Sequence, residues 1–223
     1  MHTRYWHLGN RAGGTALAVA MLSMVVACAA NTPTAQLAPT PPSPSPTLKA
    51  TSSPSCALSP VVVPTRPPVT PVFAALDPTT GLHITGIPQT IDLASYRLEV
   101  GGKVDHPLQL SYDDLRCMPK VEKHPQLVCQ GNFVDSANWA GVPIGYILSL
   151  AGAQQGATSL KLTGADGFSN SVQLTVADSD DNFLAYELEG QTLPILHGFP
   201  LRAVFSHLNG NTWVKWLIRL EVY

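Results

Sequence analysis

The sequence predicts an α+β domain built on mixed β-sheets with a few short helices. Short apolar runs separated by Gly, Pro and Asn turns fill the chain beyond about residue 71, and strand-like segments far outnumber helical ones. With 223 residues, of which 45% are hydrophobic and 13% charged, the chain has enough apolar material for one well-filled domain. Strands mixed with occasional short helices, without an internal repeat, are typical of α+β architecture.

The first 27 residues have the pattern of a bacterial lipoprotein signal peptide. Arg4 and Arg11 precede an apolar run that ends at Ala27, and Cys28 follows Val-Val-Ala as in a lipobox. The run is roughly 15 residues long, whereas a membrane-spanning helix needs about 20. We therefore expect lipidation of Cys28 and an extracytoplasmic protein anchored to the bacterial cell membrane, with an uncleaved anchor helix as the alternative.

Residues 28–71 are rich in Pro, Ser, Thr and Ala and carry almost no charge. Such a segment cannot bury enough apolar area to offset the entropy of ordering it, so we expect a disordered, partly polyproline-II tether. A ligand for proline-binding domains and a purely structural stalk are alternatives. The folded domain is expected over residues 72–223. The net charge of −2 excludes the basic surface of a nucleic-acid-binding protein.

The remaining cysteines are Cys56, Cys117 and Cys129. An odd number in an exported protein leaves at least one thiol free or with another role. Cys56 and Cys117 could form a disulfide in an oxidising compartment, or both could be free, because spacing alone does not fix connectivity.

Alternating or continuous short apolar runs predict strands over residues 96–100, 125–129, 159–163, 171–175, 183–188, 201–205 and 213–222. Gly101 and Gly102 are expected to turn the chain after the first of these strands.

Two short helices are expected. Ser111 and Asp114 form an N-terminal capping box for a helix over residues 112–116. Pro143 precedes a helix over residues 144–151, and Gly152 follows its end.

The side chains that could carry chemistry are those of Cys129, His197, Arg202, Lys215, Asp166, His83 and His207. Each has a plain structural alternative: a buried thiol, a turn-capping imidazole, or a solvated surface charge. No HExxH, CxxC or GxSxG motif occurs, so zinc protease, thioredoxin-like and serine hydrolase activities have no local support. Arginine after the turn of His197-Gly-Phe-Pro-Leu-Arg202 suits phosphate binding.

A series of short motifs resembles the molybdopterin-binding domain of the sulfite oxidase family, from about residue 82 to the end of the chain. In order, the motifs are Tyr96-Arg-Leu-Glu-Val100, Leu110-Ser-Tyr-Asp-Asp-Leu115, Cys129-Gln-Gly-Asn132, Trp139-Ala-Gly-Val-Pro143, Ala165-Asp-Gly-Phe168, Leu184-Ala-Tyr-Glu-Leu-Glu-Gly190, Leu193-Pro, His197-Gly-Phe-Pro-Leu-Arg202 and Val214-Lys-Trp216. Nine motifs in this order are a specific signal.

The resemblance implies a sulfite-oxidase-type α+β fold around a molybdenum pyranopterin dithiolene. Cys129 occupies the position of the thiolate that ligates molybdenum, and a soft thiolate suits this metal. By the same resemblance His197, Arg202, Trp213, Val214 and Lys215 bind the cofactor. The implied activity is two-electron oxygen-atom transfer on a small oxo-compound.

The substrate pocket departs from the family pattern. His83, Ile84 and Thr85 stand where sulfite oxidases carry Arg-Asn-His, so His83 and Thr85, with Asp166, are the expected substrate-pocket residues. An imidazole replaces a guanidinium only in part, since it is charged only at acidic pH. Sulfite and an S-oxide are therefore alternative substrates.

Trp213, together with Thr212, Ser206 and His207, also departs from the pattern. The resemblance does not extend to an immunoglobulin-like dimerisation domain, so we expect a monomer. The chain carries no CxxCH haem motif, which implies a separate electron-transfer partner, a cytochrome or a quinone-linked membrane protein. The signal segment lacks a twin-arginine pair. These departures leave a cofactor-free binding lipoprotein with the same fold as the alternative function.

Overall fold

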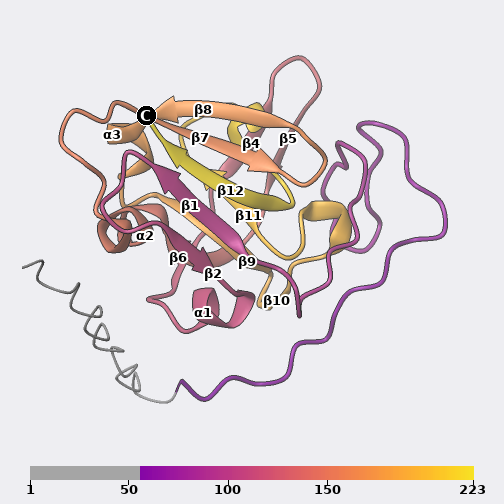
Figure 1. Cartoon of the computed structure of the whole chain (residues 1–223). Coiled ribbons are helices and arrows are strands. Elements are labelled where there is room, and N and C mark those ends of the chain that lie inside the picture. Colours follow the sequence, from indigo (N-terminus) through magenta and orange to yellow (C-terminus); the bar gives the residue numbers. More distant parts are fainter. Residues whose placement is uncertain (1–55) are drawn as a thin grey trace, which may run out of the picture. The chain divides into compact units, whose positions relative to one another are not determined.

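The computed structural model describes residues 56–223 (Figure 1). The predicted signal peptide, Cys28 and the first part of the predicted tether lie outside the described residues. Within the described part of the chain, no helix has the length and apolar character needed to cross a bilayer.

A five-stranded mixed sheet has the strand order β2-β1-β12-β7-β8. Its strands are β1 (Leu98–Gly102), β2 (Leu108–Leu110), β7 (Ser159–Gly164), β8 (Ser169–Gln173) and β12 (Leu217–Val222). β1 and β12 are parallel, whereas the other neighbours are antiparallel. In β7, Leu160 and Leu162 are buried and alternate with half-buried polar residues, so one face of the strand packs on the core.

The second sheet has the order β10-β9-β6-β3, and β11 also pairs with β9. Its strands are β3 (Val121–Lys123), β6 (Trp139–Pro143), β9 (Asn182–Leu188), β10 (Gln191–Thr192) and β11 (Arg202–Phe205). β9 and β11 are buried almost throughout, which explains their nearly continuous apolar sequences. A separate hairpin pairs β4 (Gln126–Cys129) with β5 (Phe133–Ser136).

The helices are few and short, as predicted. α1 (Tyr112–Arg116) has the predicted capping box, in which the Ser111 hydroxyl accepts from the Asp114 amide and the Asp114 carboxylate accepts from the Ser111 amide. α2 (Ile144–Ala151) ends at Gly152 in the left-handed conformation. α3 (Leu174–Ala177) and the 3-10 turns η1 (Ile195–His197) and η2 (Gly210–Thr212) complete the described elements.

Three local predictions were wrong. Gly101 and Gly102 do not turn the chain but continue β1 alongside β12; a Cβ on Gly102 would lie 2.1 Å from the Val222 carbonyl oxygen, so glycine permits this close approach. The predicted strand over 171–175 ends at Gln173, because the next residues begin α3. The predicted strand over 213–222 begins only at Leu217, since residues 213–216 form a loop beside a cavity.

A disulfide joins Cys56 to Cys117, which follows α1, with a Cα–Cα distance of 5.7 Å. This settles the alternatives for these two cysteines. Beside it, Arg116 Nη2 donates to the Ser59 carbonyl at 2.9 Å, and Val61 packs against the core. Residues 56–61 of the predicted tether thus lie against the domain.

Candidate functional site

The site is a cavity of about 360 Å³ between the β4–β5 hairpin, the start of β11 and three loops. This volume is in the range of small-molecule sites. The cavity is lined by Phe73, His83, Thr85, Gly86, Leu127, Cys129, Phe133, Asp166, Phe168, Arg202, Gly210, Asn211, Trp213, Lys215 and Trp216. Sequence segments more than a hundred residues apart therefore meet at one place.

Cys129 is the last residue of β4, and it is the free cysteine of residues 56–223. Its partner across the hairpin is Phe133, and Gly131 turns the chain with φ +77°. The half-buried thiol lines the cavity, and Asn132 Nδ2 lies 3.7 Å from Sγ. In the described residues, no three His, Cys, Asp or Glu side chains converge as a metal-binding group. A metal at this thiol would therefore need its other ligands from a cofactor.

Arg202 enters the cavity from the start of β11 and is 5% exposed. Its guanidinium lies over the rings of Trp139 and Trp213, at 4.8 and 5.4 Å from their centroids. Nη1 donates to the His197 carbonyl at 3.3 Å, while Nε is buried without a hydrogen-bond partner. Burial lowers the pKa of Arg202 to about 9, although the charge of Asp135 opposes this shift.

Lys215 is a second buried cation in the same cavity. Its Nζ donates to the carbonyls of Thr85 and Leu196 and lies 4.5 Å from the Trp216 ring centroid. Burial, reinforced by the charge of Arg202, lowers its pKa well below the usual value. Neither cation forms an ion pair with a described carboxylate within 4.0 Å. Because a buried unpaired charge is costly, this arrangement favours an anionic ligand.

Gly198 makes the turn between the two cations possible. Its φ is +114°, and a Cβ there would lie 3.1 Å from Cβ and Cγ of Lys215 and 3.2 Å from Cβ of Arg202. A side chain at this position would push both cations away from their present positions.

His197 is also buried, but it is not among the residues that line the cavity. Its Nε2 lies 2.9 Å from Asp77 Oδ2 and 2.8 Å from Thr80 Oγ1. Burial and the charge of Arg202 lower the pKa of His197 to about 4, against the opposing effect of Asp77. The ring is therefore neutral at pH 7, and its Nε2–H donates to the Asp77 carboxylate. Its backbone carbonyl holds Arg202.

His83 also lines the cavity. Its Nδ1 lies 2.7 Å from Asp135 Oδ1, and its backbone N–H donates to Asp135 Oδ2 at 2.8 Å. The ring stacks on Phe133 with a centroid separation of 4.3 Å. The predicted pocket histidine is thus in the cavity and is fixed by groups of β5.

The other predicted site residues take different positions. Thr85 and Asp166 line the cavity; Thr85 supplies its carbonyl to Lys215, and Asp166 accepts from the Phe168 amide at 3.0 Å. Trp213 lines it with its ring edge held by the Phe205 carbonyl at 2.9 Å. Val214 is buried and lies outside the lining, with its carbonyl bound to the Ala203 amide.

Sequence reasoning missed Asp77, Asp135 and Trp139, which support His197, His83 and Arg202. Asp77 starts the turn Asp-Pro-Thr-Thr-Gly, a recognisable signal for a loop but not for a buried hydrogen bond to a histidine. The alternation of Phe133 and Asp135 along β5 indicates a shared face, yet it does not reveal what that face contacts.

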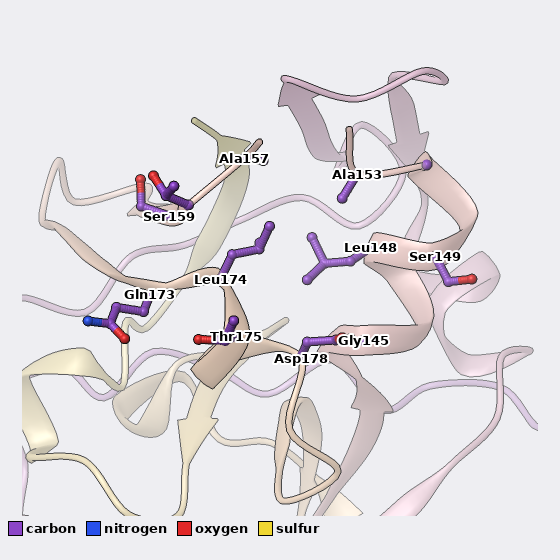
Figure 2. Close-up of a pocket in the computed structure, with 12 residues that line it drawn as sticks. Gly145, Leu148, Ser149, Ala153, Ala157, Ser159, Gln173, Leu174, Thr175 and Asp178 are labelled. Atoms are coloured by element: carbon purple, nitrogen blue, oxygen red, sulfur yellow. The ribbon is translucent and has the colours of Figure 1, made fainter. Parts of the chain in front are cut away.

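A larger hollow of about 880 Å³ lies between α2 and the β8–α3 segment. In Figure 2, Leu148 and Leu174 face each other across it, with Ser149, Gln173 and Thr175 around them. Asp178 is its one ionisable lining residue, and it is exposed. This groove offers neither a thiol nor a buried charge.

Comparison with known proteins agrees with these features. A family model described as oxidoreductase molybdopterin binding domain matches residues 84–223. The uncharacterized oxidoreductase YuiH of Bacillus subtilis is 33% identical over 137 residues, covering 61% of this chain and 69% of that protein. Mitochondrial sulfite oxidase of Homo sapiens is 31% identical over 162 residues, covering 59% of this chain but only 30% of that enzyme.

A solved structure of the sulfane dehydrogenase SoxCD from Paracoccus pantotrophus aligns with a TM-score of 0.58 and 27% identity, covering 61% of this chain and 40% of that one. The predicted sulfite-oxidase-type α+β fold is thereby confirmed. The chain belongs to the oxidoreductase molybdopterin-binding domain family and is, in class, a molybdenum-dependent oxidoreductase similar to sulfite oxidase.

Proposed function

We propose that this chain is a membrane-tethered molybdenum enzyme that transfers an oxygen atom to or from a small oxo-compound, with an S-oxide favoured over sulfite. The observation that carries the proposal is the meeting of one free thiol, Cys129, with two buried cations that form no ion pair with a described carboxylate, Arg202 and Lys215, in one cavity. A soft metal and an anionic group are the two ligands that such a site suits.

The residues present fit a molybdenum pyranopterin dithiolene. Arg202 and Lys215 would hold the anionic phosphate end, since both side chains line the cavity and the Nε of Arg202 has no partner among the described residues. Cys129 would bind the metal as a thiolate, because coordination keeps a thiol deprotonated. The aromatic ring of Trp213 and the backbone of the 213–215 loop would border the pterin.

When bound, the cofactor supplies two-electron chemistry, for which the overall balance is XO + 2e⁻ + 2H⁺ ⇌ X + H₂O. The chain itself orients and shields the reactants. Trp139 and Trp213 fix the Arg202 guanidinium by stacking, and the buried His197–Asp77 pair fixes the turn whose carbonyl holds Arg202. A preorganised cation of this kind costs no further ordering when the anion binds.

The walls of the cavity support an S-oxide with an apolar substituent. Phe73, Phe133 and Phe168 line the cavity, and Phe73 is 63% and Phe168 47% exposed. Apolar surface around an opening favours a ligand that is partly apolar over a small inorganic anion. We expect a higher kcat/KM for methyl phenyl sulfoxide than for sulfite.

Electrons would pass to or from a separate cytochrome or quinone-linked membrane protein. The lipobox before Cys28 and the proline-rich tether support a location at the outer face of the bacterial membrane, with the domain as a monomer. Cys28→Ser should abolish incorporation of labelled palmitate into the expressed chain. Unchanged labelling would exclude this anchor.

The decisive experiment is the molybdenum and pterin content of the full chain, produced with cofactor supply, beside its Cys129→Ser variant. We expect about one metal per chain in the parent, and a changed Mo(V) resonance with lost turnover in the variant. Asn132→Ala, which removes a neighbour of the thiol but no ligand, is the matched control and should retain metal. A folded parent without metal or pterin would instead support a cofactor-free binding lipoprotein.

A further inference from the structure

A strap of residues 56–71 lies on the surface of the domain and precedes the part that the family model matches, residues 84–223. The strap contains no helix or strand, and it is rich in proline, which has no N–H to donate to a sheet. It lies beside α1, because two hollows are lined both by Pro60 of the strap and by Tyr112 and Arg116 of α1. The strap is therefore an addition to the family fold and no part of its sheets.

Few non-covalent contacts hold the strap to the domain. Arg116 Nη2 donates to the Ser59 carbonyl at 2.9 Å, and partly buried Val61 packs against the core. Within residues 56–223, no other hydrogen bond joins the strap to the rest of the domain. Val62 is 81% and Val69 75% exposed, so they bury little apolar surface. One hydrogen bond and one partly buried valine do not offset the entropy of ordering a segment of this length.

The Cys56–Cys117 disulfide is the covalent attachment of the strap. It joins the first residue of the strap to the residue that follows α1, across a sequence separation of 61. At the other end, the chain is fixed just beyond the strap, where the Ala74 amide donates to the Ile84 carbonyl at 2.8 Å. Both cysteines of the disulfide are exposed, so a thiol reductant can reach the bridge in the folded domain.

We propose that the Cys56–Cys117 disulfide is a thiol-sensitive clasp that sets the free length of the tether. The reductant is a dithiol: one of its thiolates attacks the bridge to form a mixed disulfide, which its second thiol resolves. The bond between Cys56 and Cys117 breaks, a disulfide forms in the reductant, and two electrons and two protons pass to the chain.

Reduction releases the strap and leaves the two sheets and the cavity intact. The free chain beyond Cys28 then runs to Phe73 in place of Cys56, which is about 1.6-fold more residues at the same rise per residue. The domain can consequently reach farther from its anchor towards a partner or substrate. The effect on reach rests on the lipid anchor proposed above, whereas release of the strap does not.

Release of the strap is tested by ¹⁵N backbone relaxation in the full chain. On addition of dithiothreitol, the heteronuclear NOE of the Val62 and Val69 amides should fall to the values of a flexible chain, whereas Leu160 in β7 and Leu220 in β12 should keep theirs. Strap values that do not change, or that are already those of a flexible chain before reduction, would overturn the proposal. Loss of the Leu160 and Leu220 signals as well would overturn it too, because the disulfide would then hold the whole domain.

Two variants identify the disulfide as the attachment. Cys56→Ser should have a flexible strap from the start and should not respond to dithiothreitol, which controls for other effects of the reagent. Arg116→Ala removes the hydrogen bond to the Ser59 carbonyl but keeps the bridge, so its strap should stay ordered until reductant is added. A flexible strap in oxidised Arg116→Ala would overturn the proposal. Reduction of the parent chain needs no variant, so the test holds even if a variant fails to fold.

Access of the reductant is tested by alkylation. Dithiothreitol followed by iodoacetamide should label Cys56 and Cys117 in the folded chain without denaturant. Labelling of these two cysteines only after unfolding would overturn the proposal, since the clasp would then be closed to reductants.

The effect on reach is measured by neutron reflectometry of the lipidated full chain on a supported bilayer. The protein layer should extend farther from the bilayer after reduction, and Cys56→Ser should show the extended layer without reductant. An unchanged layer despite a released strap would overturn the control of tether length. Failure of the proposed lipid anchor would give no protein layer at all, while the relaxation and alkylation results would still report on the clasp.

Discussion

Two sets of buried polar groups adjoin each other in this domain, and they differ in whether protein atoms satisfy them. His197 donates to Asp77, and Thr80 completes the cluster, so this set is closed. Arg202, five residues along the chain, retains an unpaired Nε, and Lys215 has only carbonyl and aromatic partners. This second set is open towards the cavity.

His197 and Arg202 belong to one short motif, yet His197 supports the site whereas Arg202 is placed to bind a ligand. Burial alone does not distinguish them, because His197 and Arg202 are both nearly inaccessible. Nor does the size of a hollow, since the groove of Figure 2 is larger than the cavity but has no buried charge. What marks the binding site is charge that the protein itself leaves unpaired.

The largest effect should come from removing an open cation. Arg202→Met keeps much of the packing but removes the donor, so retention of the cofactor should weaken by roughly a hundredfold, about 3 kcal/mol. The same change should leave the cofactor-free chain equally stable or more stable, because a buried unpaired charge is lost. Molybdenum content and urea unfolding measure the two effects. Gln173→Leu in the groove is the control; equal metal loss there would contradict the contrast.

The closed set around His197 should lower the free energy of unfolding of the domain in acid. The folded pKa of His197 is about 4, below the value of about 6.5 in an unfolded chain, so the unfolded state binds more protons between these values. Stability should therefore fall as pH drops from about 6.5 to about 4, by about 3 kcal/mol. Urea unfolding across this range tests it. His197→Gln should flatten this part of the profile, and an unchanged profile would contradict the assignment.

Binding of an anion to the open set, Arg202 and Lys215, should raise the free energy of unfolding of the domain. Inorganic phosphate at a hundred times its Kd should raise the free energy of unfolding of the cofactor-free full chain by about 2.7 kcal/mol. Thermal unfolding at increasing phosphate measures this gain. Lys215→Met should lose most of it, whereas Gln173→Leu in the separate groove should keep it. The same gain in Lys215→Met would show that phosphate acts elsewhere.

The smallest effect should come from the glycine between the two sets. Gly198→Ala places a Cβ against Lys215 and Arg202 at a backbone φ of +114°, which should cost about 1–2 kcal/mol of unfolding free energy. Gly190→Ala, at φ +69° with nothing within 4 Å of the added Cβ, is the matched control for backbone strain alone. Similar losses of unfolding free energy in both variants would mean that crowding of Lys215 and Arg202 by the added Cβ contributes nothing to the loss.

Much of the fold was predictable because its signals are local. The capping box of α1, the Pro and Gly that bound α2 and the alternation of β7 each depend on residues a few positions apart. The predictions were wrong where residues distant in the sequence determine the local structure. Gly102 continues a strand because β12 lies against it. Residues 213–216 form a loop beside the cavity in place of the predicted strand.

The sequence by itself determined the fold class, the family motifs and the identity of the thiol and both cations. Only the tertiary structure decided which of these groups are satisfied: Asp77 binds His197 across 120 residues, and Asp135 binds His83 across 52. The physical reason is that hydrogen bonding and burial depend on neighbours in space, which spacing along the chain does not specify. The same residue types therefore give a closed support at His197 and an open binding site at Arg202.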